Sequence, residues 1–364
     1  MKILVVTGKS GGHIYPALSF LEALEERFKD VEILLVLPAK NVLSDKGLPR
    51  RNIAYLSISP VSLKLNKKNL KGFLNLCKGF SESARILSGF KPDLVVGFGS
   101  IASLPMVILA WLCRVRIILH EQNVSPCRAN RLMAFCADRI AVSFKETLPV
   151  FKNYERKTVV TGNPLRKQLS ISPQKEALGY LGLGEDKCTI LVMGCSQGSH
   201  NINAQFMQCV SLAENKSSFQ VIHLVGGSDY DVLEKAYKSQ GIDFRLFSFL
   251  ESMQYAYSAA DLVVSRAGAT TITELIFFKK PAILIPYPYA YRHQLNNARI
   301  LSERSSAVIL EEDSLTALVL KNQIQSLIED RARLEAMRRG FEGIMPQDAA
   351  GLLADLAGEA FKHA

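Results

Sequence analysis

The chain contains two similar strand–loop–helix openings, one at its start and one just past its middle. KILVVTGKSGG occupies residues 2–12, and TILVMGCSQGS occupies residues 189–199. In each opening an apolar run leads into a loop of glycine and small polar residues, and a helical segment follows. A chain of 364 residues is long enough for two domains. The similarity of these two openings therefore predicts two doubly wound α/β halves of similar design.

The segment DLVVSRAGATTITE, residues 261–274, gives the main indication of a ligand site. We expect a buried strand over Asp261–Val264, a turn over Ser265–Ala269, and a helix capped by the two threonines that follow. The free N–H groups and positive dipole end at a helix start suit an anion such as a diphosphate. Glu274, about one turn into this helix, can accept hydrogen bonds from a ribose diol. The alternative is an ordinary turn in which Glu274 only complements the helix dipole.

The first glycine loop, GKSGGH at residues 8–13, precedes a helix expected from about Tyr15 to Phe28. It matches neither the dinucleotide pattern GxGxxG nor a Walker A loop. Its glycines would let the backbone pass close to a ligand or to the facing domain. His13, at the junction of loop and helix, is a candidate proton carrier, and a structural hydrogen-bonding role is the alternative.

Further polar residues follow a strand expected at Arg116–Leu119, where HEQN occupies residues 120–123. Ligands of α/β sheets bind at the carboxyl ends of strands, although such residues can also cap the next helix. We expect Ala137–Phe144 to be the last strand of the first half and Lys145–Lys157 to approach the domain linker. Arg166, beyond the linker, can reach the cleft between the halves.

Residues 61–80 contain five lysines, no acidic residue, and interleaved leucine and phenylalanine. An amphipathic helix with a basic face can lie on an anionic membrane surface. A core-facing helix with a solvated lysine face is the alternative.

The net charge of +10 favours acidic partners. We find no aromatic–basic recognition motif and expect no nucleic-acid partner. We also expect no signal peptide and no membrane span, because the chain opens on a strand and no apolar run reaches about 18 residues.

Taken together, the motifs resemble the MurG-type glycosyltransferases, which add N-acetylglucosamine to lipid I to make lipid II. The chain departs from the family pattern at Lys9 and Ser10, where Gly-Thr is usual, and at Cys195, where glycine is usual. The resemblance runs along nearly the whole chain, through Gly11–His13 with Pro16–Leu18, Gly97–Gly99, His120–Asn123 with Asn130–Arg131, Gly162–Pro164 with Arg166, Gly194–Gly198, Arg266–Glu274 and Arg292–Asn297.

The resemblance implies a GT-B fold, in which two Rossmann-like domains face a cleft. The expected parts are an acceptor- and membrane-facing domain over residues 1–160, a UDP-sugar domain over 161–345, and a helix over 346–364 that returns to the first domain. The implied reaction transfers N-acetylglucosamine from UDP-N-acetylglucosamine to the C4 hydroxyl of lipid I, an undecaprenyl-diphosphate-linked N-acetylmuramoyl-peptide. The anomeric configuration inverts, and the product, lipid II, serves peptidoglycan synthesis. The implied location is peripheral, on the cytoplasmic face of the cell membrane, with residues 61–80 as the docking segment.

The resemblance also assigns site residues. His13 is the first candidate for the general base, and Glu121 is the second. Glu274 would hold the ribose, Leu250 would flank the uracil, and Arg166 would lie near the nucleotide. The acceptor side would comprise Ser10, Gly11, Gly12, His13 and Asn123, and the remaining donor contacts would come from Ser196, Ala269, Thr270, Thr271, Ile272, Thr273 and Gln294.

We expect no tightly bound cofactor, because the chain has no Asp-x-Asp motif that would indicate a held metal. A divalent cation stays compatible with the sequence. The competing interpretations are a sugar-nucleotide epimerase on the same fold, a transferase that uses diacylglycerol or another lipid, and a sugar-nucleotide-binding protein without turnover. A nicotinamide oxidoreductase is disfavoured by the missing GxGxxG.

Overall fold

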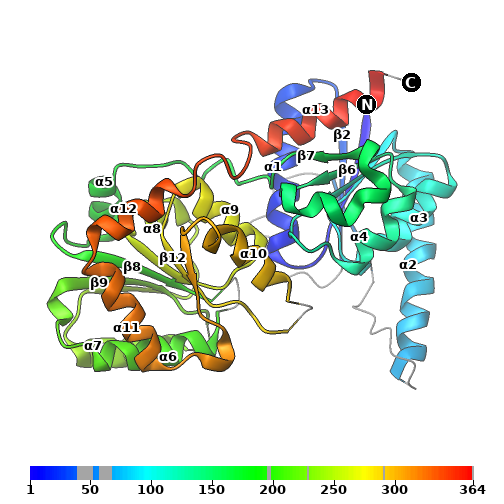
Figure 1. Cartoon of the computed structure of the whole chain (residues 1–364). Helices are drawn as coiled ribbons and strands as arrows, with labels where there is room; N and C mark the ends of the chain where they lie inside the picture. Colours follow the sequence, from blue (N-terminus) through cyan, green and yellow to red (C-terminus); the bar gives the residue numbers. More distant parts are fainter. Residues whose placement is uncertain (39–51, 57–67, 195–197, 228, 290–291, 363–364) are drawn as a thin grey trace. The chain divides into compact units, whose positions relative to one another are not determined.

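The structure is a computed structural model that describes residues 1–38, 52–56, 68–194, 198–227, 229–289 and 292–362. The chain forms two compact units (Figure 1). Unit 1 contains Met1–Arg166 together with Met345–Ala364, and unit 2 contains Lys167–Ile344. The last helix of the chain therefore belongs to unit 1, against its first helix.

Unit 1 is built on a seven-stranded sheet in which every neighbouring pair of strands is parallel. The strand order is β3-β2-β1-β4-β5-β6-β7. The strands are β1 (Lys2–Val6), β2 (Glu32–Pro38), β3 (Asn52–Leu56), β4 (Leu94–Gly97), β5 (Arg116–Glu121), β6 (Arg139–Val142) and β7 (Thr158–Val160). The helices are α1 (Gly11–Arg27), α2 (Lys68–Phe90), α3 (Leu104–Leu112), α4 (Arg128–Met133) and α13 (Ala349–Lys362), with 3-10 turns η2 (Ile101–Ser103), η3 (Ala134–Cys136) and η4 (Lys145–Lys157).

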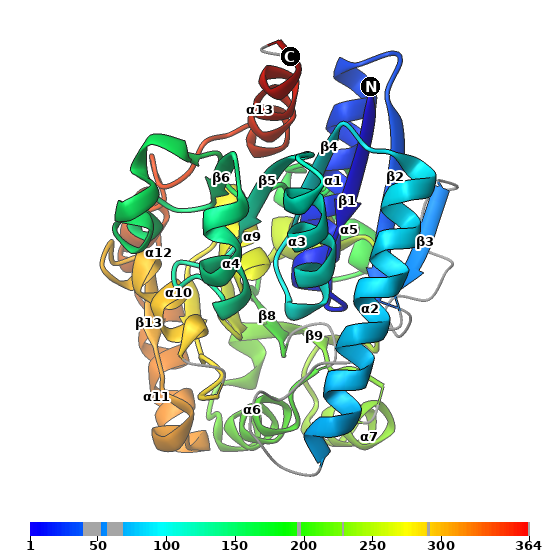
Figure 2. The same cartoon turned by 90° about the vertical axis from the view of Figure 1, so that its right-hand side faces the viewer.

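Apolar residues on both faces of β1 explain why this strand lies inside unit 1. Ile3 and Val5 pack with α1 and α13 on one face. Leu4 and Val6 pack with α2 and α3 on the other face. A strand that is covered on both sides needs an unbroken apolar sequence, as KILVV provides. Figure 2 shows α2 running beside β3 and α3.

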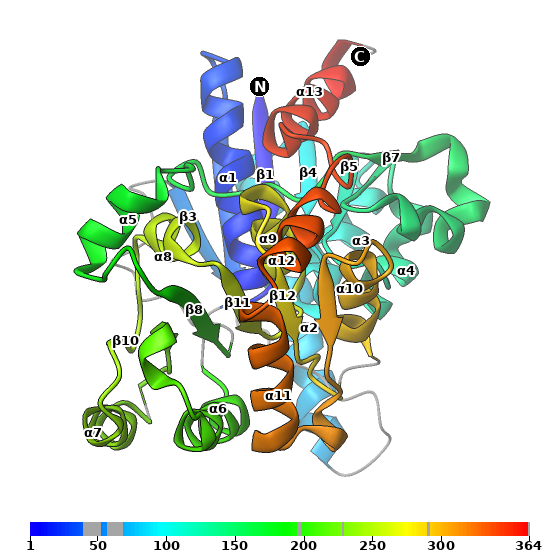
Figure 3. The ribbon, with the colours of Figure 1, turned by 60° about the vertical axis from the view of Figure 1, so that its left-hand side comes forward.

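Unit 2 repeats this plan with six parallel strands in the order β10-β9-β8-β11-β12-β13. One face of the sheet is covered by α6, α7 and α11, which lie side by side in Figure 3. The strands are β8 (Cys188–Met193), β9 (Phe219–Leu224), β10 (Phe244–Phe247), β11 (Leu262–Ser265), β12 (Ala282–Leu284) and β13 (Ala307–Ile309). The helices are α5 (Gln174–Leu181), α6 (His200–Leu212), α7 (Tyr230–Gln240), α8 (Met253–Ala259), α9 (Ala269–Phe278), α10 (His293–Ser302), α11 (Ala317–Ile328) and α12 (Arg331–Arg339), with 3-10 turns η5 (Lys216–Ser218) and η6 (Glu312–Ser314). The predicted pair of doubly wound halves is confirmed.

Two predicted elements of unit 1 are wrong in position. β6 is not the last strand of the first half, because β7 pairs with it and completes the sheet. The stretch expected to approach the linker is η4, which joins these two strands inside unit 1. β7 has only three residues, too short for its pattern to be recognised. The basic helix expected within residues 61–80 is α2, which continues to Phe90, and residues 61–67 lie outside the described part.

Two helix starts also differ from the prediction. α1 begins at Gly11, four residues before the expected Tyr15, so Pro16 lies inside the helix rather than in its first turn. The start is set by Ser10, which is extended and whose carbonyl accepts the N–H of Ile14 at 3.1 Å. α9 is capped by Gly268 without a side-chain contact, so Thr270 and Thr271 are helical residues and not caps.

Within the described ranges, no helix is both long enough and apolar enough to cross a bilayer.

Candidate functional site

Each sheet has one place where the strand order reverses, and the loops from the adjacent carboxyl ends diverge there. In unit 1 this point lies between β1 and β4, and in unit 2 it lies between β8 and β11. Open α/β sheets bind ligands at such switch points. The glycine loop before α1 and the loop before α9 both lie there, so the topology brings the sequence-predicted segments to the expected edges.

His13 is the third residue of α1 and is partly buried. Its Nδ1 lies 2.7 Å from Ser10 Oγ. Desolvation lowers the pKa of His13 to about 4, so the imidazole is neutral near neutral pH. In the tautomer with the proton on Nδ1, the ring donates to Ser10 and leaves the Nε2 lone pair available for a proton.

The space around His13 accounts for glycine at position 8. A Cβ at Gly8 would lie 2.8 Å from Ser100 Cβ and 3.1 Å from His13 Cγ. A side chain at this position would therefore push the imidazole or the β4 loop away. Gly11 is buried and Gly12 exposed in the same first turn, where their backbone can approach a ligand closely.

His120 and Glu121 are the last two residues of β5, so the strand runs two residues beyond the expected end at Leu119. Gln122 Nε2 donates to His120 Nδ1 at 3.0 Å, which leaves Nε2 to donate to the Gly162 carbonyl at 3.0 Å. Burial lowers the pKa of His120 to about 4. His120 is thus a neutral, fully engaged histidine that links β5 to the segment after β7.

The Glu121 carboxylate accepts four hydrogen bonds and is 1% exposed. Oε1 accepts from the backbone N–H and the side-chain amide of Asn123, at 3.0 and 3.2 Å. Oε2 accepts from the Cys127 N–H at 3.0 Å and from Asn130 Nδ2 at 2.9 Å. Asn123 is thereby fixed beside Glu121, and the carboxylate organises the loop from β5 to α4.

Arg166 is the last residue of the first segment of unit 1. Its guanidinium carbon lies 4.6 Å from the centre of the Tyr15 ring, a cation–π contact with the second turn of α1. This contact places Arg166 beside the helix that carries His13.

In unit 2, Glu274 lies in the second turn of α9 and is 7% exposed. Tyr257 in α8 donates its hydroxyl to Glu274 Oε2 at 2.7 Å. Tyr257 is a positioning residue that the sequence analysis missed, since nothing local links it to Glu274. The tyrosine fixes the carboxylate that is expected to meet the ribose.

Five of the other predicted donor-site residues, Ala269 to Thr273, lie in the first turns of α9. Thr273 Oγ1 donates back to the Ala269 carbonyl at 2.8 Å, so this hydroxyl is engaged within the helix. Thr270 and Thr271 are half-buried, and Ile272 is buried. Leu250 is half-buried just after β10, next to the exposed Phe249. Ser196 lies outside the described residues.

Gln294 lies near the start of α10, and its amide is held in one orientation. Its Oε1 accepts the N–H of Ala267 at 3.2 Å and the N–H of Tyr287 at 2.9 Å. The amide therefore joins the loops after β11 and β12, and its Nε2 is the group left to donate to a ligand. In the described part of the chain, no group of three or more His, Cys, Asp and Glu could hold a metal ion.

Comparisons with known proteins agree with this geometry. Residues 3–142 match the Glycosyltransferase family 28 N-terminal domain, and residues 189–350 match the Glycosyltransferase family 28 C-terminal domain. A UDP-N-acetylglucosamine–N-acetylmuramyl-(pentapeptide) pyrophosphoryl-undecaprenol N-acetylglucosamine transferase from Halothermothrix orenii is 36% identical, over 93% of this chain and 93% of the relative. The transferase of the same name from Geobacter sulfurreducens is 35% identical, over 98% and 97%.

The chain belongs to the MurG-type N-acetylglucosamine transferases. The fold agrees, since the crystal structure of Acinetobacter baumannii MurG matches with a TM-score of 0.75, covering 98% of this chain and 99% of that one at 21% identity. A structure described as a UDP-N-acetylglucosamine 2-epimerase from Listeria monocytogenes has a TM-score of 0.73 at 14% identity, and the match covers 100% of this chain and 97% of that one. That likeness shows a shared fold only. The GT-B fold class of this MurG-type chain is confirmed.

Proposed function

We propose that this chain transfers N-acetylglucosamine from UDP-N-acetylglucosamine to the N-acetylmuramoyl-peptide of undecaprenyl-diphosphate-linked lipid I, giving lipid II. The observation that carries the proposal is the 33–36% identity to transferases of this one name over at least 90% of the chain. The epimerase alternative is not favoured, because the solved UDP-N-acetylglucosamine 2-epimerases share the fold at only 12–14% identity.

The reaction forms one bond and breaks one bond at the anomeric carbon. The acceptor C4 oxygen attacks that carbon, the bond to the diphosphate oxygen breaks, and UDP leaves with the electron pair. Attack from the opposite face inverts the configuration from α to β. The hydroxyl proton must pass to a base during the attack.

We propose His13 as that base, in preference to Glu121. His13 is neutral near neutral pH, and in the Nδ1–H tautomer its Nε2 is available to take the proton. Glu121 already accepts four hydrogen bonds from donors inside unit 1, and it is almost completely buried. A carboxylate in that position has no free lone pair directed at a substrate.

We propose that unit 2 binds the donor. Glu274, oriented by Tyr257, would accept the ribose hydroxyls, and Leu250 would flank the uracil. The N–H groups in the first turn of α9 and around Ser196 would stabilise the negative charge of the leaving diphosphate. Gln294 Nε2 would donate to a hydroxyl of the sugar. None of these roles requires a resident metal, and assays with Mg²⁺ or with EDTA test this point.

We further propose that unit 1 docks on an anionic membrane surface. Trp111 and Leu112 at the end of α3, with Leu132 and Phe135 on the neighbouring α4–η3 segment, are 45–62% exposed. The Trp111 and Phe135 rings meet edge to face at 5.4 Å. Exposed aromatic and aliphatic side chains grouped in this way favour a lipid interface. The helix α2, whose sequence is basic in its first half, is the neighbour of α3 in the same unit.

The function is tested with purified protein, radiolabelled UDP-N-acetylglucosamine and a lipid I analogue. Label that moves into the lipid in proportion to enzyme, and that does not move when diacylglycerol replaces the analogue, supports the proposal. Donor binding without transfer would contradict it, and interconversion of the free sugar nucleotide would favour the epimerase. Membrane docking is tested separately, since Trp111→Ser with Phe135→Ser should reduce co-sedimentation with anionic vesicles, while an exposed change in unit 2, Val232→Ser, should not.

A further inference from the structure

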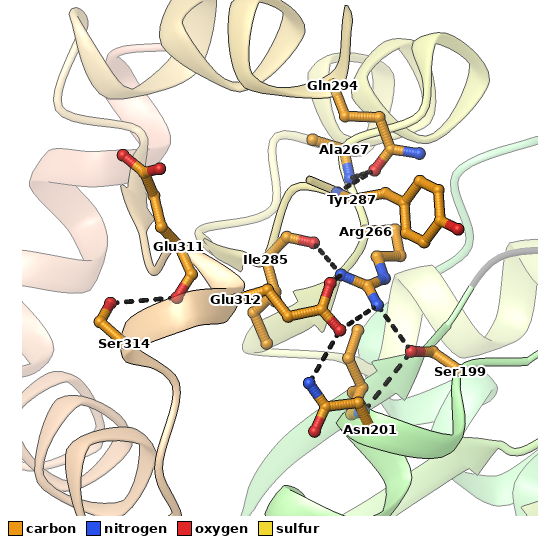
Figure 4. Close-up of polar contacts among 11 residues, drawn as sticks. Ser199, Asn201, Arg266, Ala267, Ile285, Tyr287, Gln294, Glu311, Glu312 and Ser314 are labelled. Carbon is orange, nitrogen blue, oxygen red and sulfur yellow. Dashed lines mark hydrogen bonds and ion pairs between the residues drawn. The ribbon is translucent and has the colours of Figure 1, made fainter. Parts of the chain in front are cut away.

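A buried guanidinium joins four strand ends of unit 2 (Figure 4). Arg266 follows β11 and is 5% exposed. Its Nη1 donates to the carbonyl of Ile285, just after β12, at 3.2 Å. Its Nη2 donates to Ser199 Oγ, at the N-cap of α6, at 2.9 Å. The third partner, Glu312, comes from the 3-10 turn η6 after β13.

Glu312 forms a two-pronged ion pair with Arg266, with contacts of 2.7 and 2.9 Å. Asn201, in the first turn of α6, donates Nδ2 to Glu312 Oε1 at 2.8 Å. The turn that carries Glu312 is closed by Ser314, whose Oγ and N–H both donate to the Glu311 carbonyl. The Arg266 hydrogen bond holds the pKa of the Glu312 carboxyl below its usual range, so the pair is charged at neutral pH.

The geometry of this pair determines where the other guanidinium hydrogens point. A bidentate carboxylate fixes the plane of the guanidinium, and that plane directs Nη2 toward Ser199. A buried cation without a counter-charge would instead seek water or another anion. Glu312 therefore neutralises the charge of Arg266 and fixes its orientation.

The same network reaches the α6 N-terminus by two routes. Ser199 Oγ accepts from Arg266 and also from the Ile202 N–H, the capping contact of the helix. Asn201 reaches Glu312 directly. The guanidinium also lies 5.4 Å from the centre of the Tyr287 ring, whose backbone N–H supports Gln294. One ion pair thus holds the start of α6 in register with the loops after β11 and β12.

We propose that Glu312 is a positioning residue for the donor diphosphate, acting through Arg266 and Ser199 on the start of α6. The proposal rests on the proposed function, in which N–H groups beside the start of α6 help to stabilise the diphosphate of the UDP-sugar. Glu312 does not contact the donor in this account. It keeps the N–H groups of the helix start in their binding arrangement before the donor arrives, so that binding does not have to order them.

The test compares Glu312→Gln with the native chain in the binding of UDP and of uridine by calorimetry. Glu312→Gln should weaken UDP binding about tenfold. This is the change in affinity expected from the loss of one hydrogen bond to a charged group. Uridine affinity and the KM for the lipid I analogue should not change, because the network joins the start of α6 to the loops after β11 and β12, whereas the proposed uridine contacts come from Glu274 and Leu250. Glu214→Gln is the matched control, since it neutralises an exposed carboxylate that pairs with Lys321 in the same unit, and it should leave every value unchanged.

Ser199→Ala removes the Arg266–Ser199 link to α6 while it leaves the ion pair and the Asn201–Glu312 link intact, and it keeps the proposal testable if Glu312→Gln folds poorly. Ser199→Ala should reproduce most of the loss in UDP affinity, and Ser199→Ala with Glu312→Gln should lose no more than Glu312→Gln alone. Unchanged or tighter UDP binding by Glu312→Gln would overturn the proposal, because Glu312 would then only neutralise Arg266. Equal losses for UDP and uridine would also overturn it. A native chain that binds no UDP would refute the proposed function itself. The measurement on the native chain therefore separates a failure of the proposed function from a failure of the role proposed for Glu312.

Discussion

Replacement of Glu121 by glutamine separates a structural carboxylate from a catalytic one. The carboxylate accepts two hydrogen bonds at each oxygen, at 2.9 to 3.2 Å, and is 1% exposed. In Glu121→Gln, one oxygen becomes an NH₂ group that faces two N–H donors in either amide orientation. Two buried charge-assisted hydrogen bonds are lost, each contributing about 1.5 kcal/mol or more. The expected loss is therefore about 3 kcal/mol in the free energy of unfolding of unit 1.

The assay is thermal and urea unfolding of Glu121→Gln beside the native chain. For a unit of this size, a loss of about 3 kcal/mol should lower the transition of unit 1 by about 6–12 °C. Glu146→Gln is the control, because Glu146 is exposed in the same unit, and its transition should not move. Turnover measured below the lowered transition should fall through misplacement of Asn123. Unchanged stability combined with a loss of turnover of about 10² to 10⁴ would refute the reasoning and make Glu121 the general base.

Three further predictions concern the site and its pH dependence. His13→Ala should lower turnover by about 10² or more with UDP affinity unchanged, and undiminished turnover would remove His13 as the base. Glu274→Ala should weaken UDP binding strongly and Tyr257→Phe about tenfold, through the single lost hydrogen bond; calorimetry would contradict this if Tyr257→Phe bound normally. Burial lowers the pKa of His223 to about 3, so the unfolded chain takes up a proton below about 6.5 that the folded chain does not. The free energy of unfolding of unit 2 should therefore fall as the pH drops from about 6.5 toward 3, by about 1.4 kcal/mol per pH unit from this residue. The slope should shrink in His223→Gln and persist in His200→Gln, whose ring is exposed; equal slopes in the two variants would contradict the assignment.

The sequence predicted the two doubly wound halves because their strands and loops show short local patterns. Apolar runs such as KILVV and glycine loops such as the one before His13 are short, contiguous signals. The strand β7 carried no such signal, since three residues at a sheet edge show no periodicity. The start of α1 was misplaced because two glycines normally indicate a loop, whereas here they form the first turn of the helix.

The partners of the site residues could not be predicted in the same way. Glu121 was recognised as a polar residue at a strand end. Its hydrogen-bond donors Cys127 and Asn130 come close to it only because of the path of the following loop. Tyr257 meets Glu274 from a different helix, 17 positions away. Such contacts depend on how elements pack, and a single sequence does not encode them locally. The sequence therefore indicated which residue types gather at each edge, and the structure shows which of them are already occupied.

Whether a polar side chain of unit 1 is already hydrogen-bonded inside the protein indicates whether its role is structural or catalytic. A side chain whose donors and acceptors are all satisfied inside the protein holds its neighbours in place, and it would lose those bonds if it bound substrate. Glu121 and His120 are of this kind, with every side-chain oxygen of the first and both ring nitrogens of the second engaged. His13 differs, because one ring nitrogen contacts Ser10 and the residue is partly exposed. The proton transfer is therefore expected at His13, while the buried pair on β5 keeps Asn123 and the surrounding loop in position.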